Sequence, residues 1–226
     1  MVPGARCRPP PLLSTTVGDT YEDTIDHVER SQARLDLTLA GLSEEQARGA
    51  SALPGWSRGH VATHLARNAD GLRRFVVGVR SGVPSEMYPG GPDARAAAIE
   101  EGAGRPVDLL AADLRFAGGR LIDDLRAAES AGLDTPVKWR TPVPARFIPV
   151  LRWRELEIHH LDLAVGYTCD DWPAAFVEST LATELPALAA LAPDLVPPAL
   201  PRAELLAWLI GRPTRPDLPT VPTWPF

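Results

Sequence analysis

The amino-acid sequence predicts an all-α protein, most simply an up-down four-helix bundle followed by a short C-terminal extension. Apolar residues recur at the 3.6-residue spacing of amphipathic helices in several long segments. Glycine- and proline-rich stretches separate these segments, and we find no convincing alternating strands and no internal repeat. The chain has 226 residues, of which 45% are hydrophobic, and this is enough to bury a sizeable core.

The N-terminal part of the sequence predicts one long helix and one short helix. Residues 1–17 are interpreted as a disordered leader, and the first helix should run from about residue 19 to residue 40. The apolar residues near one face of this helix are Ile25, Val28, Leu35 and Leu39. Ser43 followed by Gln46 has the spacing of a capping box, which predicts a short helix directly afterwards.

A second long helix is expected between Ser57 and about Arg80. Pro54 and Gly55 break the chain ahead of it, and Ser57 can serve as its N-cap. The apolar stripe of this helix consists of Val61, Leu65, Leu72, Phe75, Val76 and Val79. A glycine- and proline-rich connection, SGVPSEMYPGGPD, then leads into a further helix through DARAAAIEE.

The second half of the sequence predicts four more helices. In chain order they are expected at about residues 107–129, 145–165, 174–191 and 202–211. Gly118 and Gly119 weaken the middle of the first one, and the three prolines within residues 132–144 predict a loop. The proline-rich end, RPTRPDLPTVPTWPF, cannot form regular helix.

The charge and composition argue against several classes of function. The formal net charge of −6 and the pI of about 5.4 disfavour a nucleic-acid-binding protein, because such proteins need a basic face. The mean hydropathy is −0.08, and no run approaches the roughly 18 apolar residues of a membrane span. The N-terminus lacks the pattern of a signal peptide, and Cys7 and Cys169 fit neither a disulfide framework nor a zinc motif. We therefore expect a soluble cytoplasmic protein.

Histidines and carboxylates gather on two of the predicted helices, in the segments GHVATHLARN and RELEIHHLDL. His60 and His64 are four residues apart on one helix face, and so are Glu155 and His159 on another, so each pair can converge on one ion. Facing helices that each supply such ligands build metal sites in bundle cores. Imidazole and carboxylate ligands suit zinc, with iron, nickel or manganese as alternatives. His64, Glu155 and His159 are the favoured set, which leaves a coordination position for water or substrate.

Each of these residues also has an ordinary structural interpretation. A single HxxxH pattern is weak, because histidines also occur on helix surfaces, and His60 is the poorer ligand because it lies nearer the helix end. Glu155 could belong to a solvated charged face together with Arg152, Arg154 and Glu157. The HVATH segment lacks the glutamate of the HExxH motif, which disfavours peptidase chemistry. The side chains that could orient the imidazoles are Asn68 and Asp162.

The sequence resembles a known family. The segments LPGWSRGHVATHLARNADGL, MYPGGPDARAAAIEEGA and RWRELEIHHLDLAVG resemble the mycothiol-dependent maleylpyruvate isomerases, a branch of the DinB-like metalloenzyme superfamily. The resemblance covers about residues 20–170. It implies a DinB-like metal-binding four-helix bundle, placed here at residues 18–170, and a smaller C-terminal domain, placed at residues 171–226. It also implies His64, Glu155 and His159 as the zinc ligands, which is the set that the spacing favours.

The resemblance further implies two arginines that hold the acidic substrate or the thiol. They match Arg95, which follows the MY element, and Arg212, which ends the AWLIGR helix; both also fit ordinary surface arginines. The sequence departs from the family at its C-terminus, where about 55 residues follow the last metal motif and no strands are predicted. We therefore expect a short C-terminal region, with a reduced α+β domain as the alternative.

The activity that the resemblance implies is a zinc-dependent reaction with a low-molecular-weight thiol, mycothiol, as cosubstrate. The most specific version is the cis–trans isomerisation of maleylpyruvate to fumarylpyruvate, and a mycothiol S-transferase acting on another electrophile is the alternative. A metal-dependent hydrolase of the same bundle and a non-catalytic metal-binding protein also stay open. The expected partners are a small acidic or electrophilic substrate and the thiol, with no nucleic acid and no membrane, in a monomer or homodimer.

Overall fold

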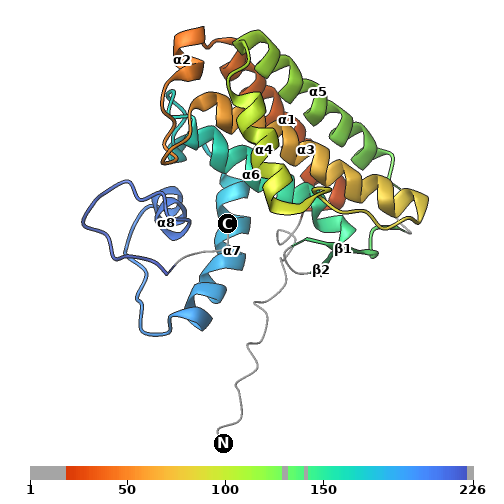
Figure 1. Ribbon diagram of the computed structural model, residues 1–226. Coiled ribbons are helices and arrows are strands. Elements are labelled where there is room, and N and C mark those ends of the chain that lie inside the picture. The colour runs from red at the N-terminus through yellow and green to blue at the C-terminus, as the bar shows by residue number, and fades with distance from the viewer. Residues whose placement is uncertain (1–18, 129–131, 140–141, 223–226) are drawn as a thin grey trace, which may run out of the picture. The chain divides into compact units, whose positions relative to one another are not determined.

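A computed structural model of the chain describes residues 19–128, 132–139 and 142–222. These residues divide into two compact units, residues 19–168 and residues 169–222 (Figure 1). The elements of the first unit are α1 (Tyr21–Ala40), α2 (Glu44–Arg48), α3 (Arg58–Ser81), α4 (Gly91–Ala103), α5 (Val107–Arg126), β1 (Pro136–Lys138), β2 (Pro142–Pro144) and α6 (Ile148–Asp162). The second unit contains α7 (Ala174–Leu191) and α8 (Arg202–Leu209). The predicted leader, residues 1–17, lies outside the described residues.

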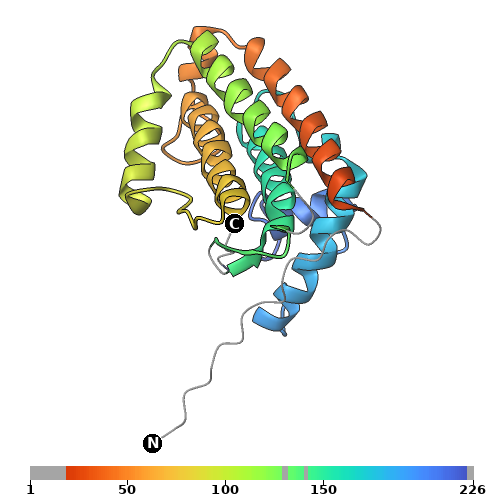
Figure 2. The ribbon, with the colours of Figure 1, turned by 90° about the vertical axis from the view of Figure 1, so that its right-hand side faces the viewer.

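Four long helices of the first unit form the bundle that the sequence predicts. α3 packs against α5 and α6, and α1 packs against the same two helices, so α1 and α3 lie diagonally across the bundle (Figures 1 and 2). Ile25 and Leu35 of α1 and Leu65 and Leu72 of α3 are fully buried. Burying a side chain of this size stabilises the fold by about 1.5–3 kcal/mol. The apolar stripes seen in the sequence therefore form the core, and the all-α fold class is confirmed.

The four helices run up, down, down and up in chain order, so they do not alternate as in the simplest up-down bundle that the sequence predicts. Arg67 pairs with Asp113 and Arg80 pairs with Asp124, so residue numbers on α3 and α5 rise together and the two helices are parallel. A parallel pair needs a long return connection. Residues 82–106, which include α4, supply it and carry the chain back to the end of the bundle at which α3 begins. Ser31 pairs with Glu157 and Thr38 pairs with His160, so α1 and α6 are also parallel to each other.

Capping boxes fix the starts of α1, α2 and α3. In each box the cap side chain accepts a hydrogen bond from a backbone N–H three residues on, and that residue's side chain accepts from the N–H of the cap. The three pairs are Thr20–Asp23, Ser43–Gln46 and Ser57–His60. A cap stabilises a helix by about 1 kcal/mol, because it satisfies backbone N–H groups of the first turn that have no partner within the helix. The three helices therefore begin where the sequence predicts.

The predicted loop at residues 132–144 is wrong in part, because the structure forms a short antiparallel hairpin there. β1 and β2 pair with Val137 opposite Val143, and both valine side chains are buried. The prolines lie at the flanking positions of these three-residue strands, where a missing N–H costs little. Proline content alone therefore misled the prediction, while the two valines supplied the apolar face that a strand needs.

α6 is shorter than the predicted helix over residues 145–165. Residues Ala145–Phe147 form a 3₁₀ turn, and the α-helix proper begins at Ile148 with Pro149 in its first turn. The helix ends at Asp162, because Ala164 and Gly166 adopt positive φ angles of 53° and 101° that turn the chain away. α6 still contains both of the metal ligands predicted for this helix, Glu155 and His159.

In the second unit, α7 and α8 agree with the predicted helices at 174–191 and 202–211 and pack against each other. α7 has the length and mean hydropathy of a membrane-spanning helix, so the prediction that no segment approaches a span does not hold for α7. The core helices of soluble proteins meet the same criterion, and α7 carries Glu178, which pairs with Arg202 of α8. Among the described residues of this unit, no strand occurs.

A buried arginine joins three helices in the middle of the bundle. Arg152 of α6 is fully buried and donates to the Leu65 carbonyl at 2.8 Å, to Asn68 Oδ1 at 2.9 Å and to Gln32 Oε1 at 2.9 Å. Burial lowers the pKa of Arg152 to about 10, so the guanidinium is still a cation at neutral pH. The acceptors of its two terminal nitrogens are all neutral oxygens, and the buried Nε has no hydrogen-bond partner.

We expect Arg152→Leu to lower the free energy of unfolding by about 2 kcal/mol or more, because it removes the donor of the buried Asn68 and Gln32 side-chain oxygens. Urea denaturation of the metal-free protein measures this. Arg126→Leu is the matched control, because Arg126 also links two helices but does so at the surface, through Asp26 and Glu29. That change should cost about 1 kcal/mol or less. Equal losses in the two variants would contradict the structural role given to Arg152.

Candidate metal centre

α3 and α6 bring His64, Glu155 and His159 together. His64 Nε2 lies 3.0 Å from Glu155 Oε2 and 3.1 Å from His159 Nε2, and His159 Nε2 lies 3.5 Å from the same Glu155 oxygen. The spacing of four residues places Glu155 and His159 one helical turn apart on one face of α6. α3 runs antiparallel to α6 and presents His64 to that face. Two nitrogens and one carboxylate oxygen therefore converge on one small volume, with all three ligand atoms within 4.8 Å of one another.

Two further side chains hold the imidazole rings in place. His159 Nδ1 lies 2.8 Å from Asp162 Oδ2, and the Asp162 carboxylate is fully buried, so this contact fixes the ring and its Nε2 direction. Arg95 Nη2 lies 2.9 Å from His64 Nδ1. The prediction that Asp162 orients an imidazole is confirmed. The same prediction for Asn68 is wrong, because Asn68 Oδ1 accepts from Arg152 instead.

Arg95 reaches His64 from α4, which belongs to the return connection between α3 and α5. Gly90 and Gly91, with φ angles of 85° and 76°, turn the chain into this helix. The Arg95 guanidinium also lies over the ring of Tyr88, 5.4 Å from its centroid. Burial raises the pKa of Tyr88, so its hydroxyl keeps its proton at neutral pH. The return connection thus adds a cation and a phenol beside the two histidines and the glutamate.

The three converging side chains have shifted pKa values of different sign. Burial lowers the pKa of His64 below its ordinary value of 6.5, and the hydrogen bond to Glu155 offsets this only in part. Burial alone would raise the pKa of Glu155, but hydrogen bonds with His159 and His64 hold it well below its ordinary value of 4.5. Burial alone would lower the pKa of His159, but contacts with Asp162 and Glu155 outweigh it and raise that pKa. At neutral pH the cluster therefore offers an ionised carboxylate and a neutral His64 imidazole, beside a His159 imidazole that holds its proton to higher pH than an ordinary histidine.

The idea of a solvated charged face on α6 is wrong for two of its four members. Arg152 is fully buried, and Glu157 is 1% exposed. Glu157 accepts hydrogen bonds from Ser31 and Tyr167 and forms an ion pair with Arg34. Sequence reasoning missed both as core residues. The available signal was their position on α6. Both faces of this helix carry polar side chains that contact other helices, so little of its surface is left exposed to water.

His60 does not join the cluster. His60 Nδ1 lies 2.7 Å from the Ser57 hydroxyl, and its Nε2 lies 3.3 Å from Glu100 at the surface. The choice of His64 over His60 therefore agrees with the geometry. Arg212 belongs to the second unit, directly after α8, and donates to the Ile210 carbonyl at 2.9 Å. Its role in the site stays a prediction.

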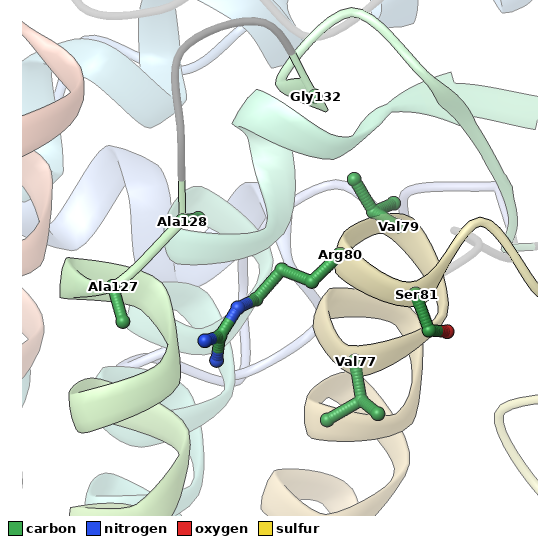
Figure 3. Close-up of a pocket in the computed structure, with 7 residues that line it drawn as sticks. All are labelled: Val77, Val79, Arg80, Ser81, Ala127, Ala128 and Gly132. Atoms are coloured by element: carbon green, nitrogen blue, oxygen red, sulfur yellow. The ribbon is translucent and has the colours of Figure 1, made fainter.

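The pocket in Figure 3 is separate from this cluster. It has a volume of about 470 Å³ and is lined by Val77, Val79, Arg80, Ser81, Ala127, Ala128 and Gly132. Val77 follows His64 by thirteen residues on α3, which corresponds to about 20 Å along the helix. Arg80 lies in this pocket and pairs with Asp124. The pocket is therefore at the other end of the bundle from the cluster.

The donor set of the cluster fits a divalent metal ion. Two imidazole nitrogens and one carboxylate are ligands that zinc accepts, and three protein ligands leave a position for an exogenous molecule. The contact between Asp162 and His159 is the kind of supporting carboxylate that metal-bound histidines have. Fold and cluster together define a class: a helical bundle in which two antiparallel helices present a His–Glu–His ligand set.

Comparison with known proteins identifies the family within this class. Residues 28–164 match the family described as the mycothiol maleylpyruvate isomerase N-terminal domain, and the chain belongs to this family. A solved crystal structure of the mycothiol-dependent maleylpyruvate isomerase has a TM-score of 0.82 and 22% sequence identity, and the match covers 93% of this chain and 100% of that one. A structure of a histidine-to-alanine mutant of that isomerase has a TM-score of 0.81 and 21% identity, with the same coverage. No curated protein sequence matches the chain.

These matches confirm the resemblance and the DinB-like fold class that the sequence indicated. They extend over the full length of the two solved chains and over 93% of this one.

Proposed function

We propose that this chain is a zinc-dependent enzyme that uses mycothiol to attack an electrophilic substrate, most specifically maleylpyruvate in its isomerisation to fumarylpyruvate. The observation that carries the proposal is the convergence of His64, Glu155 and His159 between α3 and α6. Family membership supports the thiol and the substrate class, because both appear in the description of the family. The net negative charge of the chain does not prevent binding of an acidic substrate, because the positively charged Arg95 lies at the site.

His64, Glu155 and His159 would hold the metal, and Asp162 would keep the His159 ring aligned. A bound zinc ion would supply Lewis acidity that lowers the pKa of a thiol, so that the thiolate exists near neutral pH. Glu155 brings one negative charge to the site, and the two histidines bring none once they have lost their extra protons. The ligand set therefore leaves net positive charge for an anionic thiolate to neutralise.

In the proposed reaction the cis double bond of maleylpyruvate becomes a single bond in a transient thiol adduct. The thiolate adds to one carbon of the cis double bond, and the electron pair moves through the conjugated system to the carbonyl oxygen as an enolate. The former double bond is now single and rotates. Collapse of the enolate re-forms the double bond as trans and expels the thiolate, so the thiol is not consumed. Arg95 would pair with a substrate carboxylate and stabilise the enolate charge, and Arg212 is proposed from the resemblance for a similar task.

The test is to follow maleylpyruvate absorbance with zinc-loaded protein, with and without mycothiol. The proposal expects loss of maleylpyruvate that depends on both the metal and the thiol, with fumarylpyruvate as the product and no net thiol consumed. If the protein converts maleylpyruvate equally well without any thiol, the thiol mechanism is wrong. Consumption of mycothiol with a different electrophile would favour the S-transferase, the second candidate.

A pH dependence of metal binding follows from the raised pKa of His159. The metal displaces a proton from this ring, and the Asp162 contact helps to keep that proton bound to higher pH. Affinity should therefore fall as pH decreases through the raised pKa, starting above the ordinary value of 6.5. In Asp162→Asn the fall should move to lower pH, because the raising contact is gone. Zinc affinity measured at pH 8 should also drop about 10–100-fold, because the ring has lost its orienting partner.

Chelator competition across pH 5.5–8.5 measures both effects in one series on the two proteins. An unchanged midpoint in Asp162→Asn would contradict the role given to Asp162 in raising the His159 pKa. An unchanged affinity at pH 8 would contradict its orienting role.

We also propose a soluble, cytoplasmic enzyme that acts on small molecules as a monomer or homodimer. The ion pair between Glu178 of α7 and Arg202, with 2.8 Å between Glu178 Oε1 and Arg202 Nε, supports placement of the apolar α7 in water rather than in lipid.

A further inference from the structure

The contact between Arg95 and His64 fixes where the proton of His64 lies. A guanidinium has only N–H donors, so at 2.9 Å His64 Nδ1 accepts the hydrogen bond with its lone pair. The neutral His64 ring then carries its proton on Nε2. This is the nitrogen that faces Glu155 Oε2 and His159 Nε2. The contact with Arg95 therefore selects the tautomer in which the metal-facing nitrogen has no free lone pair.

A metal ion at this site needs the other tautomer. The metal would take the lone pair of Nε2, and the proton of the neutral ring would then lie on Nδ1. An N–H on Nδ1 would point at the N–H groups of Arg95, and two donors cannot hydrogen-bond to each other. A guanidinium cation so close would also repel a divalent cation in a buried site. The Arg95–His64 contact and metal ligation by His64 Nε2 are thus mutually exclusive.

We propose that Arg95 is a positioning residue with two alternative partners, His64 in the metal-free protein and a carboxylate of the acidic ligand in the metal-bound protein. The inference rests on the proposed function, because it takes the cluster to be a metal site. Metal binding would release Arg95 from His64, and the released guanidinium would be available to the ligand. A carboxylate that draws Arg95 away would in turn favour the metal-binding tautomer. Metal and anion then strengthen each other's binding, and the coupling is reciprocal.

The surroundings of Arg95 allow this exchange. The first half of α4 is largely exposed and begins at two glycines with positive φ, the N-cap Gly90 and the first helical residue Gly91. The buried residues that anchor the helix, Ile99, Gly102 and Ala103, lie near its other end. The Arg95 side chain is half-buried, and its guanidinium already lies over the Tyr88 ring. That ring can retain the cation through a cation–π contact when the bond to His64 is broken. Moving the guanidinium therefore requires rotation of one side chain and no rearrangement of the bundle.

The test is zinc affinity by chelator competition, with and without maleate as the probe anion, at matched ionic strength. In the wild type we expect maleate to raise zinc affinity at least about fivefold. Arg95→Gln should bind zinc more tightly than the wild type when maleate is absent, because the amide oxygen can accept from Nδ1–H. The same variant should show little response to maleate. Arg67→Met is the matched control, because Arg67 is on the same helix as His64 and pairs with Asp113, and it should behave as the wild type.

A second readout reports the tautomer directly. ¹⁵N NMR of the imidazole side chains should show His64 protonated on Nε2 in the metal-free protein and on Nδ1 after zinc is added. Arg95→Gln should abolish the preference for the Nε2-protonated form. Weaker zinc binding in Arg95→Gln, or a maleate effect of equal size in that variant and the wild type, would overturn the inference.

These outcomes separate the inference from the proposed function. If the wild type binds no metal, the metal site fails and the inference fails with it. If zinc binds but maleate has no effect, only the inference is overturned. If the coupling is present but maleylpyruvate and mycothiol give no turnover, only the proposed reaction is overturned.

Discussion

Replacing His64 by alanine should yield a folded protein that retains no divalent metal after dialysis. His64 supplies one of three converging ligand atoms and is the only one from α3, so its loss leaves Glu155 and His159 of α6 as a pair. Losing a direct ligand should weaken zinc binding by more than the 10–100-fold typical of a supporting partner. Thiol-dependent activity should disappear with the metal. Elemental analysis and chelator competition measure the first effect, and circular dichroism confirms the fold.

His60→Ala is the matched control for this prediction. His60 is one turn away on the same helix, where its ring contacts Ser57 and Glu100 rather than the cluster. It should cost some stability at the start of α3 and leave the metal content unchanged. If His60→Ala loses the metal and His64→Ala keeps it, the ligand assignment is wrong.

The second large effect is expected from Glu155→Gln. The amide has nearly the same shape as the carboxylate, but it carries no charge and binds zinc poorly. Hydrogen bonds with both histidines hold the pKa of Glu155 well below 4.5, so the wild-type group is ionised throughout the neutral range. Zinc affinity should fall more than about 100-fold and activity should fall with it. Chelator competition and the maleylpyruvate assay report the two losses.

Glu157→Gln provides the comparison, because Glu157 is two residues away on the same helix and faces α1. It accepts from Ser31 and Tyr167 and pairs with Arg34 at 2.7 Å, in a buried position. Neutralising it should lower the free energy of unfolding by about 1–3 kcal/mol. Zinc affinity should change little. Similar losses of metal in the two variants would show that any disturbance of α6 empties the site, which would remove the support for Glu155 as a ligand.

Much of the fold could be predicted because its signals are local. Ser43 with Gln46 and Ser57 with His60 mark helix starts through hydrogen bonds within four residues, and the apolar stripes mark the buried faces. The helix directions were not predictable in this way. They depend on the return connection 82–106, whose path is set by packing between distant segments such as Gly102 against Thr63.

The ligand set was predictable for a similar reason. Glu155 and His159 are four residues apart on one helix, so their convergence is a property of the helix itself. The pairing with His64 across 91 residues was favoured by the two patterns on separate helices, and the resemblance implied the same set. Arg152 was not recognised as a core residue, because a charged side chain within a run of charges normally predicts a solvated face. Only the three acceptors around its guanidinium show why it is buried.

The contact between Arg95 and His64 lay beyond sequence reasoning altogether. Arg95 was suggested by resemblance as a ligand-binding residue, and nothing in the spacing connects it with His64. The structure shows the two in hydrogen-bond contact, 31 residues apart along the chain. This contact adds to the proposed function a reason for metal and anion to bind together.

The proposed function requires a thiolate to bind a metal held by His64, Glu155 and His159. Cobalt-substituted protein reports this binding, because a thiolate on cobalt produces a ligand-to-metal absorption band in the near ultraviolet. We expect mycothiol added to the cobalt protein to produce this band saturably, at one thiol per metal, and we expect no band in His64→Ala. Tightly bound cobalt with a spectrum that mycothiol does not change would show that the thiolate does not bind the metal.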